Sequence, residues 1–190
     1  MSKMPNLITP QGRRQLLKKV LTGGEARSLL RFTLYFFIVF MLLQWAYQAL
    51  ADSAIYRFYL DVLTVRPSAG LLGLIVPQDG VLAQSHRLVW LGGGLSVLNG
   101  CDGVEVMQLL IAAFVAVAGH WRRRLLGAVI GLLLIYTLNQ ARIVGLYLAV
   151  RHDRAWFELL HGLVGPLIII AVTTLFFAWW IGRYEPALPV

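Results

Sequence analysis

The chain has 190 residues, of which 58% are hydrophobic and only 14% are charged. Soluble globular domains carry about 25% charged residues, so this composition excludes an ordinary soluble enzyme. The apolar residues form long runs, a pattern that also excludes a coiled coil and a disordered chain. The formal charge of +8 comes from basic residues that flank these runs, which favours a membrane surface over nucleic acid as the partner. The sequence therefore predicts an integral membrane protein.

Four apolar stretches approach the roughly 20 residues that a helix needs to cross the bilayer core. We expect an all-α membrane protein whose four transmembrane helices are Leu29–Leu50, Val104–Gly119, Leu125–Val150 and Leu159–Ile181. The second of these is the shortest, and its helix is expected to extend toward Trp121. Leu71–Pro77 is too short to cross and is interpreted as an interfacial or re-entrant segment.

The distribution of Lys and Arg predicts the orientation of these spans. If the N-terminal segment, the Arg122–Arg124 loop and the C-terminal tail lie together, that side has a net charge of +9 and the other side −1, which together give the chain's +8. The positive-inside rule then places both termini in the cytoplasm. The chain thus divides into a basic cytoplasmic segment 1–28, a transmembrane domain 29–181 and a cytoplasmic tail 182–190.

Residues 52–100 form the only sizeable segment predicted on the exterior side. The turn-forming Asp79-Gly80 and Gly92–Gly94 separate three short stretches that are rich in strand formers. These stretches are Val81–Gln84, Arg87–Leu91 and Leu95–Leu98. We expect two or three short strands that form a small hairpin cap on the exterior.

Three polar residues fall at the exterior ends of the predicted spans, where lipid makes a polar group costly: Cys101, Arg142 and His161. Cys101 is the only cysteine, so dithiol chemistry within the chain is excluded. It lies in the loop Asn99-Gly100-Cys101-Asp102-Gly103 before a helix, whose N-terminal amides would favour a thiolate with a depressed pKa. The alternative is a small packed residue with no chemical role.

Arg142 lies inside the third predicted span, about 12 Å from its exterior end at 1.5 Å per residue. A guanidinium at that depth costs about 3 kcal/mol unless it pairs or reaches the headgroups. Asn139 lies one turn earlier, so both side chains are expected to face the interior of the bundle. The alternative is an arginine that snorkels to the exterior headgroups.

His161 begins the fourth predicted span, and Glu158 lies three residues earlier on the same helical face. An imidazole titrates near neutral pH and a carboxylate can orient it, so His161 is a candidate acid or base. The alternative is an interfacial histidine without a role. Because no His, Cys and carboxylate cluster has metal-ligand spacing, we expect neither a metal nor a cofactor.

Taken together, a thiol, an imidazole and a guanidinium from three different spans are expected to meet on one exterior surface. These groups suit acyl transfer through a thioester: the thiolate attacks, the histidine protonates the leaving amine, and the arginine stabilises the oxyanion. Two alternatives remain open. One is a non-enzymatic membrane assembly protein with an inert Cys101, and the other is an acyltransferase that relays a lipid acyl chain through the thiol.

The segment from Asn99 to Trp180 resembles the exosortases and archaeosortases, which are multi-pass membrane cysteine transpeptidases. The resemblance rests on three motifs in the order of the chain, Cys101-x-Gly103 before an apolar helix, Asn139-x-x-Arg142-Ile143 late in the next helix, and His161 at the start of the last. Many members carry Cys-Ser-Gly, whereas this chain has Cys101-Asp102-Gly103. The short length resembles the compact, single-module branch of the exosortases.

The resemblance implies that Cys101 is the nucleophile, His161 the acid and base, and Arg142 the oxyanion stabiliser. The supporting residues that we expect around them are Asn139, Gly103, Glu105 and Glu158. The implied substrates are secreted proteins that end in a short motif such as Pro-Glu-Pro, a transmembrane helix and a basic tail. The enzyme would cleave near the motif and pass the acyl group to an envelope acceptor, at the exterior or periplasmic face of the cell inner membrane.

Overall fold

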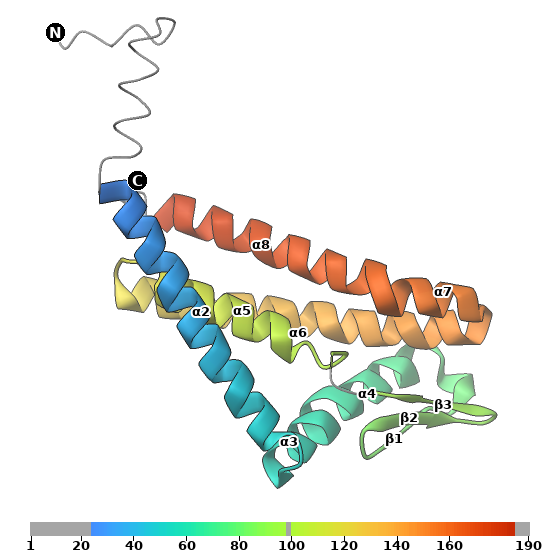
Figure 1. Cartoon of the computed structure of the whole chain (residues 1–190). Helices are drawn as coiled ribbons and strands as arrows, with labels where there is room; N and C mark the ends of the chain where they lie inside the picture. Colours follow the sequence, from blue (N-terminus) through green and yellow to red (C-terminus); the bar gives the residue numbers. More distant parts are fainter. Residues whose placement is uncertain (1–23, 98–99, 185–190) are drawn as a thin grey trace, which may run out of the picture.

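The structure, a computed structural model, describes residues 24–97 and 100–184. Its longest helices are α2 (Gly24–Leu50), α6 (Trp121–His152) and α8 (Gly165–Tyr184). Helices α6 and α8 lie side by side and run in opposite directions (Figure 1). Most of the predicted segments 1–28 and 182–190, together with Asn99, falls outside the described residues.

Within the described residues, four helices are long and apolar enough to cross a membrane: Ala26–Leu50, Ala54–Ile75, Trp121–His152 and Ala155–Tyr184. Three of them contain the first, third and fourth predicted spans. The predicted fold class, an all-α membrane protein with about four spanning helices and a small sheet, is therefore confirmed.

The second predicted span, Val104–Gly119, is shorter than expected. It forms α5 (Val104–Ala116), which at 13 residues is about 20 Å long and shorter than the bilayer core. The helix does not extend into Trp121, because Gly119 has a φ of +147° and Arg124 donates to carbonyl oxygens at the helix end. Trp121 instead begins α6.

The remaining candidate span, Ala54–Ile75, was not predicted as a helix. It is continuous through α3 (Ala54–Phe58), the π-helix η1 (Tyr59–Val65) and α4 (Arg66–Ile75). The predicted re-entrant segment Leu71–Pro77 is therefore mainly the end of this helix. The charges of Arg57, Asp61 and Arg66 interrupt the apolar pattern, which is why hydropathy alone missed it.

The predicted cap is confirmed as a three-stranded antiparallel sheet in the order β1-β2-β3. Its strands are β1 (Leu82–Gln84), β2 (Arg87–Trp90) and β3 (Gly93–Ser96). Trp90 pairs with Gly93, where a Cβ atom would lie 2.8 Å from the indole ring, so the register requires glycine there. Leu98, the predicted end of the third strand, lies outside the described residues.

The cap is fixed to the C-terminal half of α6 through the 3-10 turn η2 (Pro77–Asp79). The Tyr147 hydroxyl donates to Asp79 Oδ2 at 2.5 Å, and Arg151 Nη2 donates to Asp79 Oδ1 at 3.1 Å. The Trp90 ring packs edge-on against Tyr147, with ring centroids 4.9 Å apart. Because Tyr147 is fully buried, this contact holds the sheet firmly beside one end of the bundle (Figure 1).

The core consists of two hydrophobic clusters. One joins α5, α6 and α8 around Leu110, Ile135 and Trp180. In it, Gly131 lets α6 approach its neighbours, because a Cβ atom there would clash with the Leu110 side chain. The other cluster joins the sheet, α4 and the C-terminal half of α6, and it includes Cys101. The predicted nucleophile therefore lies in packed protein.

Candidate active site

Cys101 lies in the Gly100–Gly103 loop, between β3 and α5. Gly100 has a φ of +85° and Gly103 a φ of +78°, and residues with a side chain rarely adopt such values. Gly103 also caps the N-terminus of α5, and a Cβ atom there would lie 3.1 Å from Asn139 Cγ. The tight turn that presents the thiol thus depends on glycine at both ends.

Side chains from neighbouring helices bind three successive carbonyl groups of this loop. The bonds are Arg142 Nη1 to the Gly100 oxygen (3.1 Å), Asn139 Nδ2 to the Cys101 oxygen (3.1 Å), and the Tyr59 hydroxyl to the Asp102 oxygen (2.9 Å). The loop is irregular, so its carbonyl groups have no partners from secondary structure and need these donors. The backbone on both sides of the sulfur is fixed as a result.

The thiol of Cys101 and the imidazole of His161, which are 60 residues apart in the chain, are in direct contact. Sγ lies 3.2 Å from Nδ1 and 3.9 Å from Nε2. In the tautomer whose proton is on Nε2, Nδ1 accepts the thiol proton. The contact has the geometry of a nucleophile with its general base.

His161 lies in the π-helical turn η3 (Leu160–Val164), between α7 (Arg154–Leu159) and α8. Such turns are rare and frequently occur at functional sites. Phe157 stacks on the imidazole, with ring centroids 5.3 Å apart and planes 7° apart. Glu158, expected to orient the imidazole, lies exposed on α7.

Arg142 crosses from α6 toward the thiol. Its Nη2 donates to the His161 carbonyl oxygen at 3.0 Å and lies 3.9 Å from Cys101 Sγ. Gly165 makes room for this path, because a Cβ atom there would lie 2.8 Å from Arg142 Nε. The guanidinium is therefore held inward by the Gly100 and His161 carbonyls rather than extended away from the bundle.

Two other expected supporting residues occupy different environments. Asn139 is 2% exposed, lies one turn before Arg142 on α6, and donates to the Cys101 carbonyl oxygen in the loop. Glu105 lies exposed in the first turn of α5, where a carboxylate is favourable beside the helix N-terminus. Among the described residues, no group of three or more His, Cys, Asp or Glu side chains could hold a metal ion.

Burial raises the pKa of the Cys101 thiol above its ordinary value, which overturns the depressed pKa predicted from the helix N-terminus. The side chain is 7% exposed, so a thiolate there would lose most of its hydration. The positive charge of Arg142 lowers the pKa, the negative charge of Asp102 raises it, and burial is the largest of the three effects. The resting Cys101 side chain is therefore a neutral thiol in contact with the imidazole.

Sequence reasoning missed a group of tyrosines on the other side of the loop. The hydroxyl groups of Tyr47 on α2 and Tyr56 on α3 donate to Asp102 Oδ2, at 2.7 and 3.0 Å. Tyr59 on η1 binds the Asp102 carbonyl oxygen. Tyrosines near span ends commonly serve as interface anchors, so the sequence carried no specific signal for this cluster.

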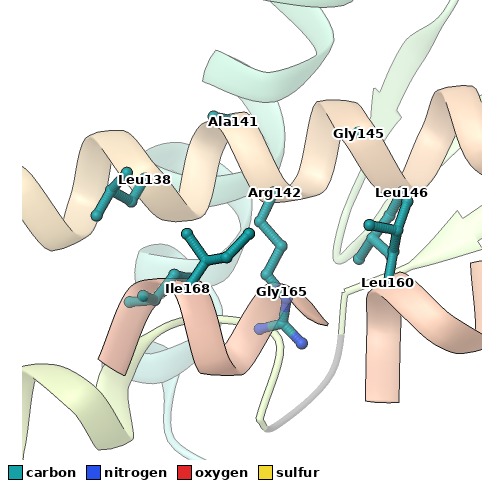
Figure 2. A pocket seen from close by; sticks show the side chains of 9 residues that line it. Leu138, Ala141, Arg142, Gly145, Leu146, Leu160, Gly165 and Ile168 are labelled. Atoms are coloured by element: carbon teal, nitrogen blue, oxygen red, sulfur yellow. The ribbon is translucent and has the colours of Figure 1, made fainter. Parts of the chain in front are cut away.

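An apolar groove of about 220 Å³ opens between α6 and α8 next to Arg142. Figure 2 shows the Arg142 side chain reaching from α6 toward Gly165, with Leu138 and Ile168 on one side and Leu160 on the other. The groove is nearly free of polar atoms apart from the arginine. It therefore suits apolar groups beside Arg142.

The fold and the site together define a membrane protein that gathers a cysteine, a histidine and an arginine from separate segments at one point. The family model for transmembrane exosortases matches residues 18–178, which is most of the chain. The chain therefore belongs to the transmembrane exosortase family, as the resemblance predicted. No curated protein and no solved structure matches it.

The raised thiol pKa predicts slow alkylation of Cys101 by iodoacetamide at neutral pH. Because Cys101 is the only cysteine, all labelling of the purified protein reports on it. A raised pKa lowers the thiolate fraction at pH 7. The rate of alkylation should therefore still increase with pH above 9.0, which is the ordinary pKa of a thiol. Arg142→Gln should move the pH profile further upward, because it removes the charge that lowers the pKa.

The control for this measurement is an exposed cysteine, Ser96→Cys on β3, in a Cys101→Ala background. Its alkylation should reach its plateau at a lower pH than that of Cys101. The raised pKa would be contradicted if the alkylation rate of Cys101 reached its plateau at a lower pH than that of the control cysteine.

Proposed function

We propose that this protein is a membrane-embedded cysteine peptidase and transpeptidase that cleaves the C-terminal sorting signals of secreted proteins. The observation that carries the proposal is the 3.2 Å contact between Cys101 Sγ and His161 Nδ1, beside the guanidinium of Arg142. Membership of the transmembrane exosortase family supports the same class of reaction.

In the first step, the sulfur of Cys101 attacks the carbonyl carbon of the scissile peptide bond while His161 Nδ1 accepts the thiol proton. Because burial disfavours a free thiolate, proton transfer accompanies the attack instead of preceding it. Arg142 binds the oxyanion that forms. Each of its Nη atoms carries a second N–H besides the one that binds the Gly100 or His161 carbonyl oxygen.

In the second step, the C–N bond breaks and the imidazolium of His161 gives its proton to the leaving amine. The leaving fragment carries the membrane helix and the basic tail, while the secreted protein remains as a thioester on Cys101. An amine or hydroxyl group of an envelope glycan or lipid then attacks the thioester carbonyl, and His161 accepts its proton. The acyl group passes to this acceptor and the Cys101 thiol is regenerated.

The substrates proposed are secreted proteins that end in a Pro-Glu-Pro-like motif, a transmembrane helix and a basic tail. A substrate anchored in the bilayer by its own helix would reach the site from the lipid side. The groove beside Arg142 would receive apolar side chains near the cleavage point. Anchoring would supply much of the affinity by raising the effective concentration of the cleavage segment.

We place the protein in the cell inner membrane with both termini in the cytoplasm and the site facing the exterior, an arrangement in which α2, α5, α6 and α8 cross the membrane and Ala54–Ile75 does not. The start of α2, the start of α6 and the end of α8 lie at one end of the bundle, away from the sheet (Figure 1). Arg123 Nη1 donates to the Tyr184 carbonyl oxygen at 3.0 Å, which joins two of these ends. The Arg122–Arg124 cluster thus lies near the end of α8, and the positive-inside rule assigns such a basic cluster to the cytoplasmic face.

Substitutions in the three residues should abolish processing together. Cys101→Ala, His161→Ala and Arg142→Ala should each lower cleavage by about 100-fold or more, and a triple variant should be little worse, because the residues act as a unit. Arg142→Lys keeps the charge but loses the planar fork that binds two carbonyl groups, so it should also be strongly impaired. Cys101→Ser should fail as well, because a hydroxyl group is a much weaker nucleophile.

The measurement is the ratio of precursor to cleaved product in cells that contain equal amounts of each variant in the membrane. Arg151→Lys, on the same helix but bonded to Asp79, is the matched control and should process normally. Processing at the wild-type rate by Cys101→Ser or Arg142→Lys would exclude the transpeptidase and favour an assembly protein.

Filling the groove should weaken substrate binding without changing the thiol. Gly145 lines the groove, and a Cβ atom there would have no neighbour within 4 Å, so Gly145→Leu should fold and occupy the space. We expect about tenfold slower processing at limiting substrate and an unchanged rate of Cys101 alkylation. Gly182→Leu, an equally open position on α8 outside the groove, is the control. Equal processing by the two variants would exclude the groove as a substrate site.

A further inference from the structure

Asp102, the residue that follows the nucleophile, has a buried carboxylate that the proposed reaction does not use. Its side chain is 1% exposed. The ion pairs among the described residues, Arg66–Asp61 and Arg151–Asp79, do not include it. A buried carboxylate without compensation is strongly unfavourable, so the fold must gain something from placing one here.

Hydrogen-bond donors surround this carboxylate. Tyr47 and Tyr56 donate their hydroxyl groups to Oδ2, and the Val104 amide donates to Oδ1 at 3.2 Å. The two tyrosine rings meet edge to face, with centroids 5.5 Å apart, and their hydroxyl oxygens lie 3.2 Å from each other. Because every one of these bonds to Asp102 needs an acceptor, the arrangement suits an ionised carboxylate and forms strong, charge-assisted bonds.

The bonds to Asp102 connect the loop that carries Cys101 to α2 and α3, whereas the bonds to Gly100 and Cys101 connect it to α6. Asn139 and Arg142, both on α6, hold the carbonyl groups of Gly100 and Cys101. The tyrosines lie on α2 and α3, more than 40 residues before the loop in the chain, and they hold Asp102. The loop is therefore anchored twice around the sulfur, through the Gly100 and Cys101 carbonyl groups to α6 and through the Asp102 carboxylate to α2 and α3.

We propose that Asp102, Tyr47 and Tyr56 are positioning residues for the nucleophile: they fix the loop so that Cys101 Sγ stays in contact with His161 Nδ1. The inference rests on the proposed function, in which that contact carries the chemistry. At a separation of 3.2 Å, a shift of about 1 Å takes the imidazole out of hydrogen-bond range, and shifts of that size cost catalysts about 100-fold. The effect of His161 on the thiol should therefore depend on the tyrosine hydroxyl groups.

A double-mutant cycle on alkylation tests this dependence without any sorting substrate. The rate of iodoacetamide reaction at Cys101 is measured in the full-length protein, with and without His161→Gln, in three backgrounds. These are the wild type, Tyr47→Phe/Tyr56→Phe, and Tyr147→Phe. The last is the matched control, because it removes a hydroxyl–carboxylate bond of the same kind, to Asp79, at the sheet.

We expect His161→Gln to slow alkylation about tenfold or more in the wild type and by the same factor in Tyr147→Phe. In Tyr47→Phe/Tyr56→Phe the factor should fall to about twofold or less, because the thiol no longer meets the imidazole. If the double variant does not reach the membrane, Tyr47→Phe and Tyr56→Phe are measured singly, and each should show an intermediate factor.

The same factor in all backgrounds would overturn the positioning role and leave the tyrosines as ordinary supports of the fold. That outcome would leave the proposed function intact. The absence of any effect of His161→Gln in the wild type would instead contradict the proposed function, because the imidazole would not act on the thiol. The two failures are thus told apart by the wild-type arm alone.

Discussion

The hydrogen bonds from α6 to the loop that carries Cys101 are the interaction on which the rest of the site depends. An irregular loop has no partners from a helix or sheet for its carbonyl groups, so it needs donors from side chains around it. Asn139 and Arg142 supply two of them, and both point to the loop because they lie one turn apart on one helix. The halves of α6 on either side are fixed by packing, through Gly131 against Leu110 and through Tyr147 against the sheet.

The same constraint gives Arg142 two connected roles. Its bonds to the Gly100 and His161 carbonyl oxygens join the loop to η3 and so help to set the distance between the thiol and the imidazole. Its Nη2 also lies 3.9 Å from the sulfur, where the proposed reaction develops negative charge. A charge that would be costly in lipid is thus stabilised by protein dipoles. The raised pKa of the thiol fits this picture, because a low-polarity site favours a neutral resting state and proton transfer during attack.

Features with a strong local pattern could be predicted from the sequence. The apolar runs predicted α2, α6 and α8, and the strand-forming stretches bounded by glycines predicted the sheet. The resemblance and the positions of Cys101, Arg142 and His161 identified the residues that the structure brings together.

Features that depend on distant contacts could not be predicted. Ala54–Ile75 was missed because three charged residues interrupt its apolar pattern, and α5 is short because of a glycine φ and an arginine from the next helix. Asp102 meets Tyr47 across 55 residues, a distance over which no spacing rule applies. The pKa of the Cys101 thiol is raised because the side chain is buried in the tertiary structure, and this effect outweighs the local effect of a helix N-terminus.

The measurement that tests the central claim most directly is the intact mass of the protein during turnover of a peptide that contains a sorting motif, with no acceptor present. We predict a covalent adduct with the mass of the N-terminal fragment, located on Cys101, released by hydroxylamine and absent from Cys101→Ala. Cleavage of the peptide without such an adduct, or an equal rate of cleavage by Cys101→Ala, would contradict the thioester mechanism.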